Sequence, residues 1–452
     1  MHFIHLIENK LANTSERSVK VLKNIVASFI LKGWVGIAQL LLVPLTLSCL
    51  SNYEYGVWMT ISTMLVWIDS MDIGLGNGMR NMLATFRAEG NNEKAKQVVS
   101  TCFFSLFVFM LIVGSFLYAV EHYIDFYSFL NIDSTIIKNL TLVIQLSTII
   151  VCATFVFKFV GNVYLALQLP AVNNLFLVLS NTMVLIALYV AQKCLGEVSL
   201  LLVALISTMS PLLVFVVSFP FTFIKRYPEL CPSIKSFRVS MLKGIFYLGI
   251  KFFLLQLSGI LLFSTSNIII SHYIDPLSVT PYQVAQRYFN IILVLFTIIV
   301  VPLWSATTDA YARKDYEWIK MCGRKGRQLM LVILPILIVM SLVAPYIYSL
   351  WTLDKVTVSP SITWIMALYM LVTLFSLYYA HLLYGMGKIY IQMWVTLIES
   401  VLFIPLAIFG AINWNVTGVI SALTFVNLGC CFTNYYQFYL ISHGKAKGLW
   451  QK

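Results

Sequence analysis

Twelve long apolar segments, separated by short polar ones, dominate the pattern of this chain. A helix that crosses the hydrocarbon core of a bilayer needs about 20 mostly apolar residues, and each segment meets that length. The apolar runs are continuous, whereas the strands of a membrane barrel alternate, so a barrel is excluded. The pattern therefore predicts an all-α, polytopic membrane protein. The predicted spans are 24–48, 55–73, 98–120, 137–157, 171–192, 198–222, 244–273, 284–306, 328–352, 359–386, 390–411 and 415–440.

The composition agrees with this class. Of the 452 residues, 60% are hydrophobic and 11% are charged, whereas about a quarter of the residues in soluble domains are charged. This excludes a soluble enzyme, a disordered chain and a disulfide-rich secreted scaffold. The eight cysteines show no CxxC spacing and are expected to fill apolar space. The sequence has no P-loop, HExxH or GxSxG motif, so we expect neither an ATP-driven pump nor an enzyme.

The basic residues predict the topology. With the N-terminus inside, 24 of the 30 Lys and Arg residues fall in cytoplasmic segments and three fall in external ones. Such an asymmetry follows the positive-inside rule, so both termini are expected to be cytoplasmic. The rule also accounts for the net charge of +12 without a nucleic-acid partner.

The longest internal link, 223–243, divides the chain near its midpoint. We expect a six-helix N-terminal lobe (1–222), a cytoplasmic linker (223–243) and a six-helix C-terminal lobe (244–452). The pattern A-x-x-[ND]-x-E-x-x-K occurs after the second predicted helix of each half, at 88–96 and 312–320. These features predict a duplicated unit with a pseudo-two-fold axis along the membrane normal, an arrangement that transporters use to rock two lobes around a central site.

Six ionisable residues fall inside the predicted spans. An ionisable group at the bilayer centre costs about 3 kcal/mol, so each is a candidate functional residue. Three of the six are cations, which favours an anionic or phosphate-bearing substrate. The six residues are Lys32, Asp69, Asp72, Lys251, Arg287 and Glu399.

Each candidate has a structural alternative. Asp72 and Arg287 lie close enough to a helix end to reach headgroup water, and Asp69 could form an ion pair with Lys32. Lys32 is too deep in its helix for easy snorkelling, as is Lys251, which favours a polar cavity. Glu399 is the strongest proton-site candidate, because a carboxyl near the bilayer midplane is costly to keep charged. A neutral structural acid is the alternative there.

Several motifs give the chain a family resemblance. It resembles the Wzx-type polysaccharide flippases of the multidrug/oligosaccharidyl-lipid/polysaccharide (MOP) exporter superfamily, and the likeness covers nearly the whole chain. The motifs are DIGLGNGMRN at 72–81, EYGVW at 54–58, VTPYQVA at 279–285, PLWSA at 302–306 and TDAYA at 308–312. We expect them to be loop and helix-end signatures, with GLGNG as a turn after the second helix. The signature residues are Gly76, Asn77, Gly78, Arg80, Asn81, Trp304 and Asp309.

The resemblance implies two lobes around a cationic cavity lined by the first two helices of each lobe. It implies a bacterial inner-membrane flippase that moves an undecaprenyl-diphosphate-linked oligosaccharide, an O-antigen or capsular repeat unit, to the outer leaflet. Lys32, Lys251 and Arg287 would attract the diphosphate. No cofactor is expected beyond H⁺ or Na⁺ as coupling ion. Relatives often carry an acid in the place of Ser266, so coupling here would shift to Glu399 or Asp69, with Asp72 as a further candidate.

Two other functions remain open. A cation-coupled multidrug exporter would share the fold, but drug cations favour carboxylates, and this chain offers three cations against three acids in its spans. A membrane polysaccharide polymerase or ligase would need a sizeable external loop rich in Arg, His or acids. The longest external loop, 121–137, contains no Arg. A polymerase and a chain-length regulator are possible partners of a flippase.

Overall fold

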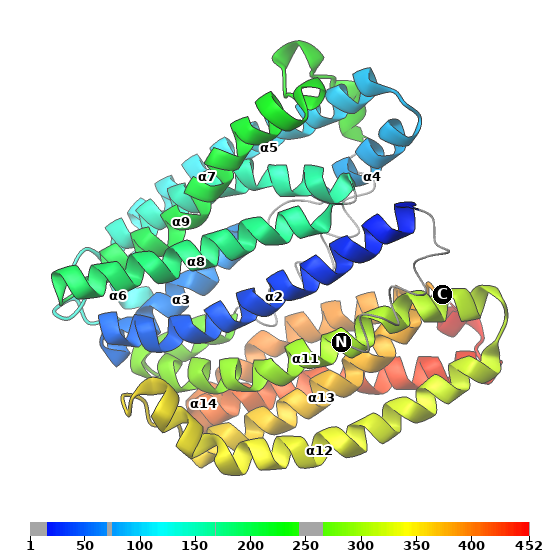
Figure 1. Cartoon of the computed structure of the whole chain (residues 1–452). Helices are drawn as coiled ribbons and strands as arrows, with labels where there is room; N and C mark the ends of the chain where they lie inside the picture. Colours follow the sequence, from blue (N-terminus) through cyan, green and yellow to red (C-terminus); the bar gives the residue numbers. More distant parts are fainter. Residues whose placement is uncertain (1–15, 70–74, 168, 244–264, 452) are drawn as a thin grey trace, which may run out of the picture. The chain divides into compact units, whose positions relative to one another are not determined.

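The structure is a computed structural model that describes residues 16–69, 75–167, 169–243 and 265–451. Helices form nearly all of this part of the chain (Figure 1). Their bounds are α2 Glu16–Cys49, α3 Asn52–Asp69, α4 Leu75–Ala88, α5 Asn92–Tyr123, α6 Phe126–Phe129, α7 Leu140–Ala166, α8 Pro170–Leu195, α9 Leu200–Pro220, α11 Val279–Ala312, α12 Tyr316–Thr352, α13 Pro360–Gly385 and α14 Tyr390–Ser442. A helical segment at 265–273 precedes α11.

Eight of the described helices are long and apolar enough to cross a membrane: α2, α5, α7, α8, α9, α12, α13 and α14. The last contains two predicted spans, because its backbone leaves the helical conformation at Trp414 and Asn415. The predicted spans 55–73 and 284–306 correspond to α3 and α11, whereas most of 244–273 lies outside the described residues. The prediction of an all-α, multi-pass membrane protein is confirmed.

The turn predicted at GLGNG is wrong for Gly76, Asn77 and Gly78, which lie in the first turns of α4. The reason is the apolar face of this helix. Its residues Leu75, Met79 and Leu83 recur at intervals of four and are all buried. Burying three such side chains is worth several times the cost of about 1 kcal/mol that each glycine adds to a helix. Arg80 is exposed on the same helix.

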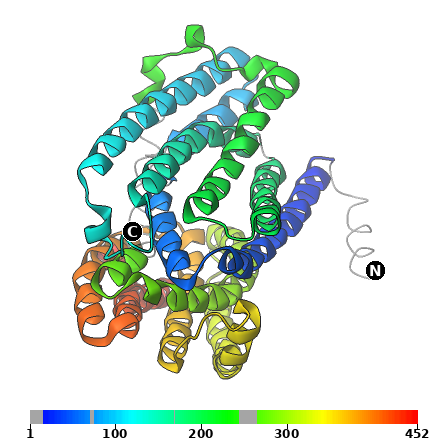
Figure 2. The same ribbon diagram turned by 90° about the vertical axis from the view of Figure 1, so that its left-hand side faces the viewer.

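The chain forms two compact units that interleave along the sequence. The first contains Met1–Leu45, Met71–Tyr123 and Val143–Phe253, and the second contains Thr46–Ser70, Ile124–Leu142 and Leu254–Lys452. The division into halves at 223–243 stays a prediction. In the first unit α8 packs along α9 and α4 along α5, and Figure 2 shows α8 and α9 from a second side. In the second unit α13 packs against α11, α12 and α14 (Figure 1).

Candidate functional site

Two of the motifs pack against each other in the second unit. Gly56 of EYGVW, in α3, lies directly against the carbonyl of Pro276, just before VTPYQVA. Any side chain at Gly56 would occupy the place of that carbonyl. Next to this contact, the Thr280 hydroxyl donates a hydrogen bond of 2.6 Å to the Asn52 carbonyl at the start of α3. The motifs therefore join α3 to the start of α11.

A buried polar network begins one turn deeper. The Asn267 amide donates to the Met59 carbonyl at 3.2 Å, and its oxygen accepts from Gln283 at 2.8 Å. The same Gln283 amide also donates to Gln286 at 3.2 Å. Asn267 and Gln283 are both buried, so these bonds offset the cost of removing amides from water.

Arg287 follows one helical turn after Gln283, on the same face of α11. It is half-buried, and its Nη2 lies 3.3 Å from the Met59 sulfur. Tyr55 in α3 is fully buried and interacts electrostatically with this guanidinium. The structure thus places a half-buried cation beside neutral hydrogen-bonding groups, an arrangement suited to an anionic group carrying further polar substituents.

Ser266, the position where an acid was expected from relatives, belongs to the same region. Its side chain is fully buried, as is that of Tyr282, one residue before Gln283. Sequence reasoning named Ser266 and Arg287 but missed Asn267 and Gln283. Their polarity within an apolar stretch was the available signal.

The other candidate residues divide between the two units and the part of the chain outside the described residues. Lys32 is exposed on α2 in the first unit. Asp69 ends α3 and lies ten residues beyond Met59, about 15 Å further along the helix. The structure therefore does not bring Asp69 to Arg287. Asp72 and Lys251 lie outside the described residues.

Glu399 is buried in the first half of α14. Its carboxylate accepts a hydrogen bond from the backbone amide of Cys430 in the second half of this helix. Gly429 leaves the room that the carboxylate needs, because a Cβ there would lie 2.6 Å from the Glu399 oxygen. Glu399 therefore ties the two halves of α14 together, and its role in ion coupling stays a prediction.

Trp304 of α11 is exposed on one side and lies beside two rings of α13. Its ring lies 5.0 Å from that of Tyr384 and 6.2 Å from that of His381, measured between centroids. Gly385 abuts the Trp304 carbonyl. Trp304 thus contributes to the contact between α11 and α13. The side chains of Asn77, Asn81 and Asp309 lie outside the described part of the chain.

Sequence reasoning placed Glu121 in an external loop, and this is wrong. It lies in α5 and is buried, with a carboxylate oxygen accepting from the Thr148 hydroxyl at 2.7 Å. A signal for this was present, because Glu121 follows the buried Met110 by 11 residues, three turns along one helix face.

These helices define a multi-pass membrane transporter fold. Over 92% of this chain and 95% of the other, the structure matches the inward-facing conformation of a multidrug resistance MATE family transporter of the MOP superfamily, with a TM-score of 0.71 and 15% identity. No family model matches the chain.

Two curated relatives bear on the kind of transporter. The chain is 22% identical over 306 residues to a protein of Salmonella typhimurium named "Putative O-antigen transporter", covering 66% of this chain and 67% of that one. It is 19% identical over 303 residues to a protein of the same name from Salmonella typhi, covering 65% and 66%. The resemblance to MOP exporters seen in the motifs is thus confirmed, over about two thirds of each relative's length.

Proposed function

We propose that the protein is a flippase that moves an undecaprenyl-diphosphate-linked oligosaccharide from the inner to the outer leaflet by ion-coupled alternating access. The observation that carries this proposal is the half-buried Arg287 beside the Asn267–Gln283 network, within a transporter fold. The guanidinium suits a diphosphate, and the amides suit sugar hydroxyls. The names of the two Salmonella relatives support the same cargo.

In this proposal Lys32 and Lys251 add positive charge to the substrate site. Glu399, Asp69 or Asp72 exchanges H⁺ or Na⁺ as the lobes rock. The protein resides in the bacterial inner membrane with both termini in the cytoplasm. It works beside a polysaccharide polymerase and a chain-length regulator.

Deletion of the gene in its host, followed by mass spectrometry of the polyprenyl lipids, tests the cargo. A flippase predicts accumulation of a diphosphate-linked oligosaccharide and loss of surface glycan. An unchanged lipid pool with intact glycan, in a host without a redundant homologue, would refute it. A single repeat unit already joined to the surface acceptor would indicate a polymerase instead.

A cation-coupled multidrug exporter is the second candidate, because the solved structure matched above is a multidrug resistance transporter. In that case the deletion strain would show increased sensitivity to cationic drugs and a normal lipid pool. The Arg287 cation argues against such cargo, since it repels a cationic drug.

Lys32→Ala is expected to abolish surface glycan while leaving the amount of protein in the membrane unchanged. The exposed ammonium of Lys32 makes little contribution to packing, so the effect would come from lost attraction for the diphosphate. Glycan gel profiles and immunoblots of membranes measure the two quantities. Lys193→Ala, which removes a charge at a helix end, is the control, and normal glycan in Lys32→Ala would remove Lys32 from the site.

Glu399→Gln separates the two roles of this acid. A glutamine oxygen can still accept the Cys430 amide, so thermal stability should stay close to that of the wild type. Transport should lose its dependence on the proton gradient, because an amide binds no proton. Glu399→Leu, which removes the acceptor, should instead lower stability by about 1–3 kcal/mol. Wild-type gradient dependence in Glu399→Gln would assign Glu399 a structural role alone.

A further inference from the structure

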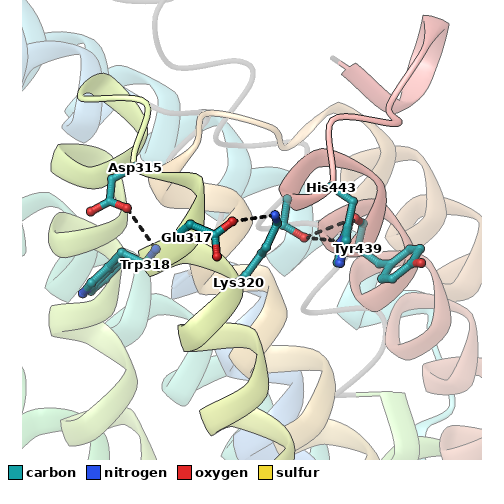
Figure 3. Close-up of polar contacts among 7 residues, drawn as sticks. Asp315, Glu317, Trp318, Lys320, Tyr439 and His443 are labelled. Atoms are coloured by element: carbon teal, nitrogen blue, oxygen red, sulfur yellow. Dashed lines mark hydrogen bonds and ion pairs between the residues drawn. The ribbon is translucent and has the colours of Figure 1, made fainter.

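A hollow lies at the end of the second unit where α12 begins and α14 ends. It consists of two adjoining depressions of about 440 and 330 Å³ that share Lys320, Ser442 and His443. Figure 3 shows Lys320 between Glu317 of its own helix and the end of α14, which carries Tyr439 and His443. None of the sites discussed above uses this region.

Basic side chains line the hollow. Lys320, Arg324 and Arg327 recur at intervals of four and three residues along α12, which places them on one helix face. Lys320 forms an ion pair of 2.8 Å with Glu317. Glu317 is the acidic residue among the described residues that line the hollow. The two arginines thus leave an excess of positive charge.

Hydrogen bonds fix parts of the wall of the hollow, in which Arg324 and Arg327 are exposed. The hydroxyl of Tyr379, a residue buried in α13, donates to the carbonyl of Gly323, which lines the hollow beside Arg324, at 3.1 Å. Lys388 donates to the Gln451 carbonyl at 2.5 Å and so holds the C-terminal segment, while His443 bonds the Tyr439 carbonyl of its own helix end at 2.8 Å. This part of the wall is therefore preorganised, which lowers the entropic cost of binding a ligand.

The hollow also lies at the level of lipid headgroups. The apolar run of α12 begins at Leu329, two residues after Arg327, and its Leu331 and Val332 side chains are exposed. Tyr435 and Tyr439 line the hollow from α14. Aromatic and basic side chains at the end of an apolar span mark the membrane interface.

We propose that this hollow binds the phosphate of a lipid headgroup, with Lys320, Arg324 and Arg327 as the binding residues. Basic pockets between membrane helices bind anionic headgroups, and arginine offers two parallel donors to a phosphate. The ligand is either an anionic phospholipid or a polyprenyl diphosphate. The site does not depend on the proposed flippase function, because a phospholipid would bind here whatever the cargo.

The test uses the full-length protein purified in neutral detergent and lipid binding measured by native mass spectrometry. The probes are phosphatidylglycerol, undecaprenyl diphosphate and zwitterionic phosphatidylcholine. Arg324→Gln/Arg327→Gln is compared with Lys314→Gln/Lys325→Gln, which removes the same charge from exposed positions of this end that do not line the hollow. Arg324→Lys/Arg327→Lys retains the charge, and thermal unfolding checks that each variant is folded.

The arginine-to-glutamine variant should bind the preferred phosphate lipid about tenfold more weakly or worse. The Lys314→Gln/Lys325→Gln control should bind the phosphate lipid with wild-type affinity. All variants should bind phosphatidylcholine with the same affinity. If phosphatidylglycerol is the lipid that binds the arginine-to-glutamine variant more weakly, the ligand is an anionic phospholipid. If undecaprenyl diphosphate is that lipid, the ligand is a polyprenyl diphosphate. Equal affinity in wild type and the arginine variant, or equal loss in both charge-matched variants, would overturn the proposal. Failure of the flippase proposal would leave the phosphatidylglycerol result unchanged.

Discussion

Arg287→Ala is expected to abolish surface glycan and to cause the lipid-linked oligosaccharide to accumulate, as in a deletion strain. The guanidinium is half-buried beside Asn267 and Gln283, and removing a cation from a partly desolvated anion site typically costs 2–5 kcal/mol. That corresponds to a loss of about thirtyfold or more in substrate affinity. Quantitative mass spectrometry of the polyprenyl lipids and glycan gel profiles give the readout.

Two variants control for structural damage. Met59→Leu removes the sulfur that Arg287 contacts but conserves volume, so it should cost little stability and leave transport intact. Arg287→Lys keeps the charge and should retain part of the activity. If Arg287→Ala supports wild-type glycan, or if Met59→Leu loses as much glycan as Arg287→Ala, Arg287 is not a substrate-binding residue.

Gly418→Ala is expected to lower the free energy of unfolding by about 2 kcal/mol. The two halves of α14 cross at Gly410 and Gly418, where the backbone of each glycine lies against that of the other. A Cβ on Gly410 would lie 2.5 Å from the Gly418 carbonyl oxygen, and one on Gly418 would clash with Gly410. Because the obstacle is backbone, the helices must separate. Thermal unfolding in detergent measures the loss.

Gly36→Ala is the matched control. A Cβ at Gly36 in α2 meets no atom within 4 Å, so this substitution should leave stability unchanged or raise it by about 0.5–1 kcal/mol through the helix propensity of alanine. A stable Gly418→Ala variant would show that the two halves of α14 do not approach each other as closely as described.

Hydropathy alone predicted most of the fold, because a membrane span is a local property of about 20 residues. The hydropathy and turn pattern failed at one short segment. The glycines of GLGNG suggested a turn, although the burial of Leu75, Met79 and Leu83 stabilises a helix there. By contrast, the break in α14 at Asn415, where φ is +53°, separates the two spans that hydropathy predicted at 390–411 and 415–440.

The candidate site could be predicted only in part. Buried charge in an apolar segment identified Arg287, because its cost is visible in the sequence. The hydrogen bond from Asn267 to Met59 joins residues 208 positions apart, and no periodicity in one chain relates them. The same holds for Glu399, whose burial was expected but whose partner, the Cys430 amide, depends on how α14 folds back.

The packing of α3 against the start of α11 has a consequence for how the protein is made. The Asn52 carbonyl accepts a hydrogen bond from Thr280, and Gly56 lies against Pro276. A ribosome synthesises α3 more than 200 residues before those partners, so the face of this helix that they cover stays uncovered until they have been made. The second unit therefore cannot be completed in the order of synthesis. Its assembly must wait, within the membrane, until the later half of the chain has been inserted.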